Sequence, residues 1–274
     1  MRPAPDIDSI DNRDEAWVRG FSRWVYPKLA RYFRASIRGL DRVPEGAALI
    51  VGNHSGGFVS ADMWLLGGAL YLRGGLASVP FGLAHEIAVK LPGVHQVLPR
   101  LGAVRASPEN ASRLFERGDK VLVYPGGDVD AFRPTKYRDR ILFGRRRGYV
   151  RLALRCGVPI VPVVSAGSHE TWWVLTEGRA LARLLGTHRW LRLDVVPITW
   201  SLPWGFMIGF PPVYIPLPTR ILIEVLEPIA FERSGEEAAS DAEYVEACHA
   251  RVLSRMQSAL DRLARERKQL KRSR

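Results

Sequence analysis

The stretch that decides the fold of this chain reads Val51-Gly52-Asn53-His54-Ser55-Gly56-Gly57-Phe58-Val59-Ser60-Ala61-Asp62. The apolar run from Ala47 to Val51 predicts a short buried strand that stops at Gly52. The chain then passes through a glycine-bearing loop that carries His54, and Ser60 is a good N-cap for a new helix. A histidine at a strand end and an aspartate at a helix start form the pattern of a general base and its orienting acid.

Predicted strands and helices alternate on the C-terminal side of this stretch, through the middle of the chain. Strands are predicted at 94–104, 120–124, 158–164 and 220–226, and helices at 60–72, from Ser107 onward, at 148–156 and at 241–267. This alternation predicts an α/β domain with a mostly covered mixed sheet flanked by helices. We expect one domain over residues 13–267, a flexible N-terminus at 1–12 and a basic tail at 268–274.

The segment from Asp14 to Ser36 has aromatic and aliphatic residues near helical spacing, with basic residues between them. This pattern predicts an N-terminal amphipathic helix. Such a helix suits a membrane interface, and it equally suits packing against the core of the domain. The two interpretations are compatible.

The net charge of +12 and the sequence pI of about 10.2 favour anionic partners, which include anionic lipid, phosphorylated cofactors and nucleic acid. The basic residues are scattered and form no recognisable nucleic-acid module, so we expect no nucleic-acid partner. The two cysteines, Cys156 and Cys248, have no metal-ligand spacing, and we expect neither a metal site nor a disulfide framework. The polar, acidic N-terminus shows no secretory signal.

One segment, Val195 to Leu217, carries no charged residue and contains five prolines, which an ordinary membrane-spanning helix would not tolerate. Its aromatic residues suit the interfacial region of a bilayer. We interpret it as an apolar loop that lies in one leaflet or covers an acyl groove. The alternative is a proline-rich buried connection.

His54 is the first candidate catalytic residue, because a neutral imidazole can remove a proton from an alcohol. Asp62 is its candidate partner, which would hold the tautomer and stabilise the imidazolium. Both residues also have structural interpretations. A loop histidine is often simply hydrogen-bonded in place, and an acid in a first helical turn is stabilised by the helix dipole.

Three further groups are candidates for binding. Gly126 and Gly127, within Pro125-Gly126-Gly127-Asp128, could offer backbone N–H groups to an oxyanion or phosphate, although a plain tight turn has the same sequence. Arg105 follows a predicted strand and could meet a substrate phosphate. Arg145, Arg146 and Arg147 precede a predicted helix and could bind the phosphates of coenzyme A, or they could form a solvated charge run.

At this point the chain resembles the lysophospholipid/glycerol acyltransferase family. Four blocks occur in the family's order: Asn53-His54 through Asp62, Gly102-Ala103-Val104-Arg105, Tyr124-Pro125-Gly126-Gly127, and Val158-Pro159-Ile160-Val161-Pro162-Val163. The resemblance covers roughly Val43 to Val164, and more loosely Arg220 to Ile229. Each block alone is modest, and their shared order makes the resemblance fairly specific.

Two departures from the family pattern bear on the site. Seven residues separate His54 from Asp62, where the family usually has four, and Asp128 therefore becomes a fallback orienter. The third block has Gly126-Gly127-Asp128 where many members have Glu-Gly-Thr-Arg. This version is similar to the branch that acylates neutral lipids such as diacylglycerol, and Asp130 matches an acidic position in that branch.

The resemblance implies acyl transfer from acyl-CoA to a hydroxyl of a glycerolipid, with His54 as general base and no cofactor beyond the acyl-CoA co-substrate. It implies a peripheral enzyme at an anionic membrane surface, on its cytoplasmic face. Three alternatives remain open: a phosphorylated acceptor such as lysophosphatidic acid, a hydrolase that uses water as acceptor, and a non-enzymatic basic protein that binds lipid or nucleic acid.

Overall fold

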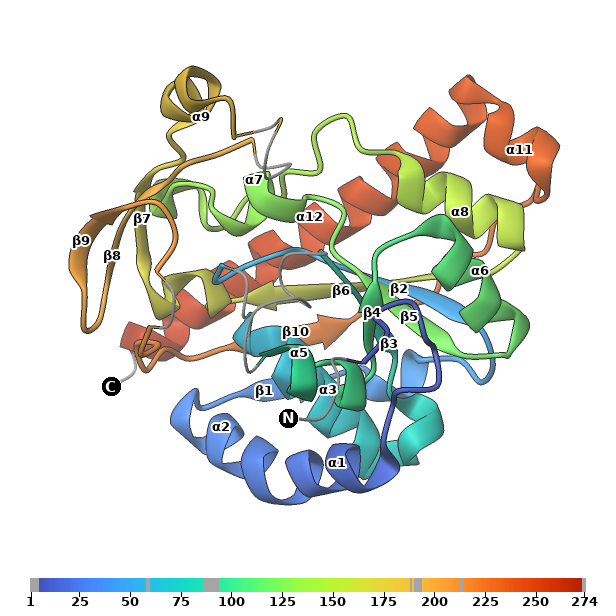
Figure 1. The fold of residues 1–274 in the computed structure, drawn as a ribbon, viewed down its shortest axis with the longest axis horizontal. Coiled ribbons are helices and arrows are strands. Elements are labelled where there is room, and N and C mark those ends of the chain that lie inside the picture. Colours follow the sequence, from blue (N-terminus) through green and yellow to red (C-terminus); the bar gives the residue numbers. More distant parts are fainter. Residues whose placement is uncertain are drawn as a thin grey trace.

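The structure is a computed structural model, and it describes residues 5–57, 60–85, 94–187, 189, 194–211 and 214–272. Its centre is a seven-stranded sheet with the order β1-β10-β6-β2-β5-β3-β4 (Figure 1). The strands are β1 (Ser36–Arg38), β2 (Ala48–Gly52), β3 (Phe81–Ala84), β4 (Ala103–Arg105), β5 (Lys120–Val123), β6 (Ile160–Ala166) and β10 (Leu222–Val225). Neighbouring strands run parallel except β10 and β6, which are antiparallel. The sheet is therefore mixed, as predicted.

Helices cover both faces of this sheet (Figure 1). Alternate residues of β2 point to opposite faces: Leu49 and Val51 join one core cluster, and Ala48 and Ile50 join the other. The first cluster is covered by α6 (Pro108–Glu116), α8 (Gly148–Cys156) and α12 (Ala242–Arg272), and the second by α2 (Tyr26–Tyr32) and α3 (Ala61–Gly74). Because both faces are buried, β2 is apolar at every position before Gly52.

The remaining elements are shorter. They are α1 (Glu15–Gly20), the π-helical turn η1 (Phe21–Val25), α5 (Val94–Val97), α7 (Gly127–Ala131), α9 (Arg179–Leu185), α11 (Glu236–Ser240), and the 3-10 turns η2 (Leu40–Arg42), η3 (Leu76–Ser78), η4 (Pro99–Leu101), η5 (Thr135–Tyr137) and η6 (Ser168–Thr171). The predicted N-terminal helix is confirmed as the run of α1, η1 and α2. Within the described ranges, no helix combines the length and apolarity that crossing a bilayer requires.

The prediction of a strand over 94–104 is mostly wrong. The structure has α5 and η4 in this stretch, and only Ala103–Arg105 is strand. Two residues explain the difference. Pro99 has no N–H to donate to a strand neighbour, and Gly102 has a φ of 98°, which breaks an extended run.

A second, three-stranded sheet has the order β7-β8-β9 and consists of β7 (Trp173–Thr176), β8 (Ile198–Ser201) and β9 (Gly205–Ile208). The interpretation of Val195 to Leu217 as an irregular apolar loop is therefore wrong in its conformation, because β8 and β9 form an antiparallel hairpin within it. The alternating sequence Ile198-Thr199-Trp200-Ser201 fits a strand with one buried and one outer face. Pro203 is accommodated in the turn.

The ends of the chain are tied to the domain over part of the predicted flanks. Ile10 packs in the main core, Asp8 accepts a hydrogen bond from Arg105 Nε at 2.7 Å, and α12 continues to Arg272. The predicted boundaries at residues 12 and 268 stay predictions.

Candidate active site

The candidate site lies where three parallel strands end. β2 pairs with both β5 and β6 in parallel, so the loops that follow these strands emerge at the same edge of the sheet. These loops carry His54 after β2, Tyr124 through Asp128 after β5, and His169 after β6. The predicted placement of His54 and of the Gly126-Gly127 turn at strand ends is confirmed.

His54 is partly buried, and its ring lies 4.7 Å from the ring of Tyr124, measured between centroids. A Cβ at Gly52 would come within 2.5 Å of the Tyr124 ring, so glycine is what lets this ring pack against the strand end. Burial lowers the pKa of His54 to about 4, with help from the positive charge of Arg133, while the negative charge of Asp128 acts in the opposite direction. The imidazole is therefore neutral near pH 7, which a general base requires.

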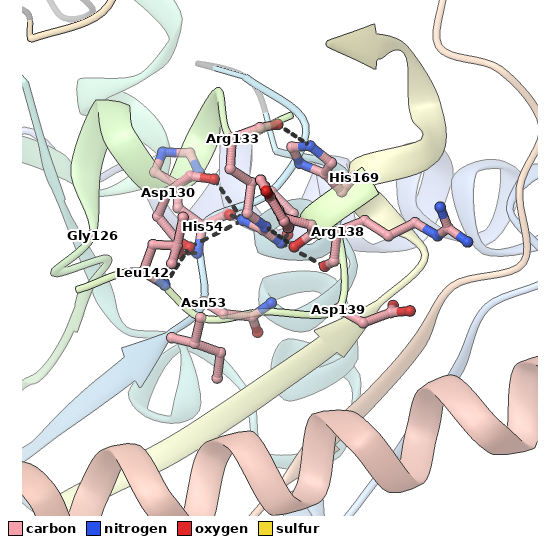
Figure 2. Close-up of polar contacts among 12 residues, drawn as sticks. Asn53, His54, Gly126, Asp130, Arg133, Arg138, Asp139, Leu142 and His169 are labelled. Carbon is pink, nitrogen blue, oxygen red and sulfur yellow. Dashed lines mark hydrogen bonds and ion pairs between the residues drawn. The ribbon is translucent and has the colours of Figure 1, made fainter. Parts of the chain in front are cut away.

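The backbone of His54 is held from both sides by a buried ion pair. Asp130 Oδ2 accepts a hydrogen bond from the His54 backbone N–H at 2.7 Å, and Arg133 Nη1 donates one to the His54 carbonyl at 2.6 Å. Asp130 and Arg133 contact each other at 3.1 Å, and neither is exposed. Figure 2 shows the two side chains meeting at His54. The pair fixes the position of the His54 backbone, and hence the point from which the imidazole side chain extends.

Sequence reasoning missed Arg133 entirely. Its guanidinium also donates to the nearby carbonyls of Tyr137 and Arg138 and to Ser55 Oγ, and the contacts with Ser55 and His54 depend on the tertiary fold. His169 is buried, and its Nε2 lies 2.7 Å from the Arg133 carbonyl (Figure 2). An arginine that lies between a short helix and Pro134 has no local sequence signal that separates it from a surface arginine.

Asn53 fixes the start of the loop that carries His54. Its side-chain amide donates to the Ser165 carbonyl at 3.0 Å, and its Oδ1 accepts from the Ser165 N–H at 2.8 Å. This pair of hydrogen bonds mimics one more residue pair between β2 and β6. The loop therefore leaves the sheet from a rigid point.

Asp62 lies at the first turn of α3 and is buried. Its Oδ1 accepts hydrogen bonds from Ser60 Oγ and from the Met63 N–H, and burial raises its pKa to about 6. Asp62 shares the lining of a small cavity with Tyr124, the residue whose ring packs on His54. Over the described residues, no hydrogen bond joins Asp62 to His54, and the buried Nδ1 of His54 has no hydrogen-bond partner. The role of Asp62 as the orienter of His54 therefore stays a prediction.

Asp128, the fallback orienter, has partners at both carboxylate oxygens. Arg146 Nη2 donates to its Oδ1 at 2.8 Å, and the Asp194 N–H donates to its Oδ2 at 2.6 Å. Arg146 also donates to the Gly126 carbonyl at 2.5 Å. Asp128 thus ties the turn after β5 to the segment that begins at Asp194.

Close packing requires glycine at 126, and a φ of 50° favours glycine at 127. A Cβ at Gly126 would clash with Asp130, and a Cβ at Gly127 would clash with Arg146. The Gly127 N–H donates to the Tyr124 carbonyl at 3.1 Å, so it is engaged in the turn itself. Their role in binding an oxyanion stays a prediction.

The predicted phosphate-binding arginines do not converge. Arg105 lies on β4 at the edge of the sheet and pairs with Asp8 at 2.7 Å. Of the three arginines before α8, Arg146 contacts Gly126 and Asp128, Arg147 pairs with Glu246 of α12 at 2.6 Å, and Arg145 is exposed. Among these four, Arg146 is the one that the structure brings to the loops around His54.

An apolar pocket opens beside the start of α3. It is lined mostly by apolar side chains and glycines from α1, η1, α3, β3, η4, β4 and β5, and these include Phe21, Met63, Trp64, Gly67, Gly82 and Leu122. Met63 follows Asp62 directly, and Leu122 also lines the small cavity that Asp62 and Tyr124 share. The apolar pocket therefore adjoins the candidate site from within the domain.

With this geometry in place, comparison with known proteins is informative. Residues 34–166, which hold β2, His54, Asp62, β5 and the Gly126-Gly127 turn, match the model of the family described as Acyltransferase. The resemblance to the acyltransferase family is confirmed. The match ends with β6, so the three-stranded sheet and α12 lie outside it.

Relatives cover most of this chain. An uncharacterized protein of Mycobacterium tuberculosis is 30% identical over 84% of this chain and 60% of its own length. The mouse "DGAT1/2-independent enzyme synthesizing storage lipids" is 24% identical over 85% of this chain and 66% of its own length. The chain therefore spans about three fifths to two thirds of these relatives.

The fold is also found in a solved structure. The 1-acyl-sn-glycerophosphate (LPA) acyltransferase PlsC from Thermotoga maritima is similar over 88% of this chain and 80% of its own, with a TM-score of 0.50 and 17% identity. The mixed α/β architecture is thus similar to the fold of PlsC, and the predicted fold class is confirmed.

Proposed function

We propose that this protein transfers a fatty acyl group from acyl-CoA to a hydroxyl of a glycerolipid, with His54 as the general base. The observation that carries the proposal is the His54 imidazole, held neutral by burial at the edge where β2, β5 and β6 end. A neutral imidazole takes the hydroxyl proton as the oxygen attacks the thioester carbonyl. The tetrahedral intermediate then expels the thiolate of coenzyme A, and the imidazolium returns the proton to it.

Three features support the assignment of roles around His54. Asp62 is the candidate orienter, because it begins α3 directly after the loop that bears His54. The turn at Gly126 and Gly127 is the candidate oxyanion site, for which one well-placed donor is worth about 3 kcal/mol. Arg146 is the candidate for phosphate binding, because it lies against Gly126 and Asp128 and keeps a partly exposed side chain.

The apolar pocket beside α3 is the proposed site for the acyl chain. It is lined by Phe21, Trp64 and Leu122 with few polar groups, and it adjoins the cavity that holds Asp62. A fatty acyl chain needs such a lining, because each buried methylene contributes about 0.8 kcal/mol.

For the acceptor, we favour a neutral glycerolipid over a phosphorylated one. The name of the mouse relative refers to the synthesis of storage lipids. The name of PlsC refers instead to a phosphorylated acceptor, 1-acyl-sn-glycerophosphate. Arg105, which would favour a phosphorylated acceptor, is paired with Asp8 at the sheet edge. The protein would act at an anionic membrane surface, to which its net charge of +12 draws it.

The test is an incubation of the purified protein with several acyl-CoAs and a panel of lyso- and neutral lipids, with products identified by mass. We expect an acylated neutral lipid, and we expect His54→Ala to abolish its formation while the thermal unfolding transition persists. Products formed only from phosphorylated acceptors would change the acceptor class, and release of free fatty acid alone would indicate a hydrolase. Equal turnover by His54→Ala would remove His54 from the mechanism.

A further inference from the structure

The three-stranded sheet has two faces of opposite environment. One row of cross-strand partners crosses all three strands and consists of Trp173 on β7, Trp200 on β8 and Phe206 on β9. The next row on the same face pairs Ile198 of β8 with Ile208 of β9. The residues between them on the other face, Val174 and Thr199, are fully buried. In contrast, Trp173 is 53% exposed, Phe206 72% and Ile208 66%. We call the five residues Trp173, Ile198, Trp200, Phe206 and Ile208 the outer face.

An outer face made of large apolar side chains is unusual for a sheet that covers a domain, because such faces normally alternate apolar inside with polar outside. Other large apolar side chains are also exposed nearby in the sequence: Trp204 at the hairpin end is 51% exposed, and Leu184 on α9 is 83% exposed. The residues from Val195 to Leu217 contribute no charged side chain. Leaving this much apolar surface in water is costly, so a partner that covers it is expected.

The inner side of the same sheet packs directly on the candidate site. Trp172, Val174 and Val195 form a cluster with Ala131 and Phe132, which separate Asp130 from Arg133 in the sequence. Tyr214 stacks on Trp172 and donates to the Gly56 carbonyl at 2.7 Å, within the loop that carries His54. The partner that covers the outer face is therefore separated from the loops that bear His54 and Asp130 by this sheet and its inner cluster.

We propose that the outer face of β7-β8-β9 docks on an anionic lipid surface, with its tryptophans and Phe206 in the headgroup region. This inference rests on the proposed function, since a lipid acceptor must reach His54 from a membrane. Charge complementarity favours lipid over a second copy of this chain. Exposed Arg183 and Arg189 adjoin the apolar residues of α9, and a copy carrying the same net charge of +12 would be repelled. Tryptophan beside arginine is the composition of a bilayer interface.

The test is co-sedimentation with vesicles of phosphatidylcholine alone and of phosphatidylcholine with phosphatidylglycerol, using the full chain. Phe206→Ser and Ile208→Ser change side chains that are mostly exposed, so both variants are expected to fold. Leu72→Ser is the matched control, because Leu72 is also an exposed apolar residue, 54% exposed, but lies at the end of α3. We expect each of the first two variants to lower partitioning onto anionic vesicles about tenfold, and Leu72→Ser to leave it unchanged.

The outcomes separate this proposal from the proposed function. Wild-type binding that survives both substitutions, or no vesicle binding by the wild type, would overturn the lipid-docking face. So would a dimer in size-exclusion chromatography that Phe206→Ser converts to monomer, because the face would then be an interface between copies. Acyl transfer to short-chain, water-soluble acceptors reports on His54 alone, and we expect Phe206→Ser to retain it. Vesicle binding through the outer face with no acyl transfer by the wild type would leave the docking face standing and reject the enzyme.

Discussion

Asp130 accepts a hydrogen bond from the backbone N–H of His54 at 2.7 Å, although 76 residues separate the two in the sequence. The same carboxylate accepts from the Leu142 N–H at 2.9 Å and pairs with Arg133. Both oxygens of this carboxylate accept hydrogen bonds, and a neutral side chain of the same size, asparagine, has only one oxygen that can accept them. The position of the proposed base therefore depends on an acid and a cation that never touch its imidazole.

We expect Asp130→Asn to lower kcat by roughly 10²-fold. The NH2 group of asparagine would face one of the donors that now point at the carboxylate, and the repulsion would displace His54. Small displacements of a catalytic group cause losses of this size. The KM for acyl-CoA should change little. Steady-state kinetics with separate kcat and KM values check this. Asp119→Asn is the matched control, since Asp119 pairs with Arg13 and Arg117 at the opposite end of β5. Equal effects of both substitutions would show that Asp130 has no special link to His54.

Arg133→Met should lower the free energy of unfolding by about 3–5 kcal/mol, because it leaves Asp130 buried without its cation. Combining Arg133→Met with Asp130→Leu should recover part of this loss, since no buried charge then remains. Urea unfolding of the single and double variants measures both values. Additive effects in the double variant would contradict the coupling of the two residues.

The two candidate orienters can be separated by substitution. Asp62→Asn should lower turnover by about 10²-fold or more, the usual size of effects on a general base. Asp128→Asn should have a smaller effect on chemistry, because both Asp128 oxygens already accept hydrogen bonds from Arg146 and Asp194. Single-turnover rates on saturated enzyme make the comparison. A mild loss in Asp62→Asn beside a large loss in Asp128→Asn would assign the role to Asp128.

The lowered pKa of His54 predicts how stability depends on pH. The pKa falls from 6.5 to about 4 on folding, so between these values the unfolded chain binds this proton and the folded protein does not. Stability from this group is fully present above pH 6.5 and is lost as the pH falls towards 4. His54→Gln should therefore gain stability relative to the wild type when the pH is lowered from about 7.5 to about 5. A wild-type-to-variant difference in unfolding free energy that is the same at both pH values would contradict the shift.

Gly67→Leu should shorten the acyl chains that the enzyme accepts. Gly67 lines the apolar pocket, and a Cβ at this position meets no atom within 4 Å, so a side chain can extend into the space. Gly20→Leu is the control, because Gly20 also lies in a helix with open space around its Cβ but does not line the pocket. Relative kcat/KM values over a series of acyl-CoAs report the preference. An unchanged preference in Gly67→Leu would place the acyl chain elsewhere.

Local patterns in the sequence predicted much of the central architecture. The apolar run before Gly52 became β2, and the Ser107-Pro108-Glu109 signal became the start of α6, where Ser107 caps the helix through the Asn110 N–H. Such signals are short-range, because a cap or a buried strand is specified by residues next to one another. The prediction failed over 94–104, where apolar residues fit a helical turn as well as a strand.

Long-range contacts could not be predicted in this way. The alternation in Ile198-Thr199-Trp200-Ser201 is visible in the sequence, but only pairing with β7 and β9 determines that Trp200 joins an outer row with Trp173 and Phe206. Register is a property of two strands, and one residue of slip would exchange the faces. The sequence therefore shows that the segment from Val195 to Leu217 is apolar, but strand pairing determines which of its side chains share one face with Trp173.

Residues next to one another along the chain were enough to predict that His54 follows a buried strand and that two glycines follow another. The hold of Asp130 and Arg133 on the His54 backbone, and the contact of His169 with Arg133, follow from the fold, which joins segments that are far apart in the sequence. Burial is the cause, because a buried arginine or aspartate is stable when donors and acceptors surround it, and here His54 and His169 complete that set from other segments.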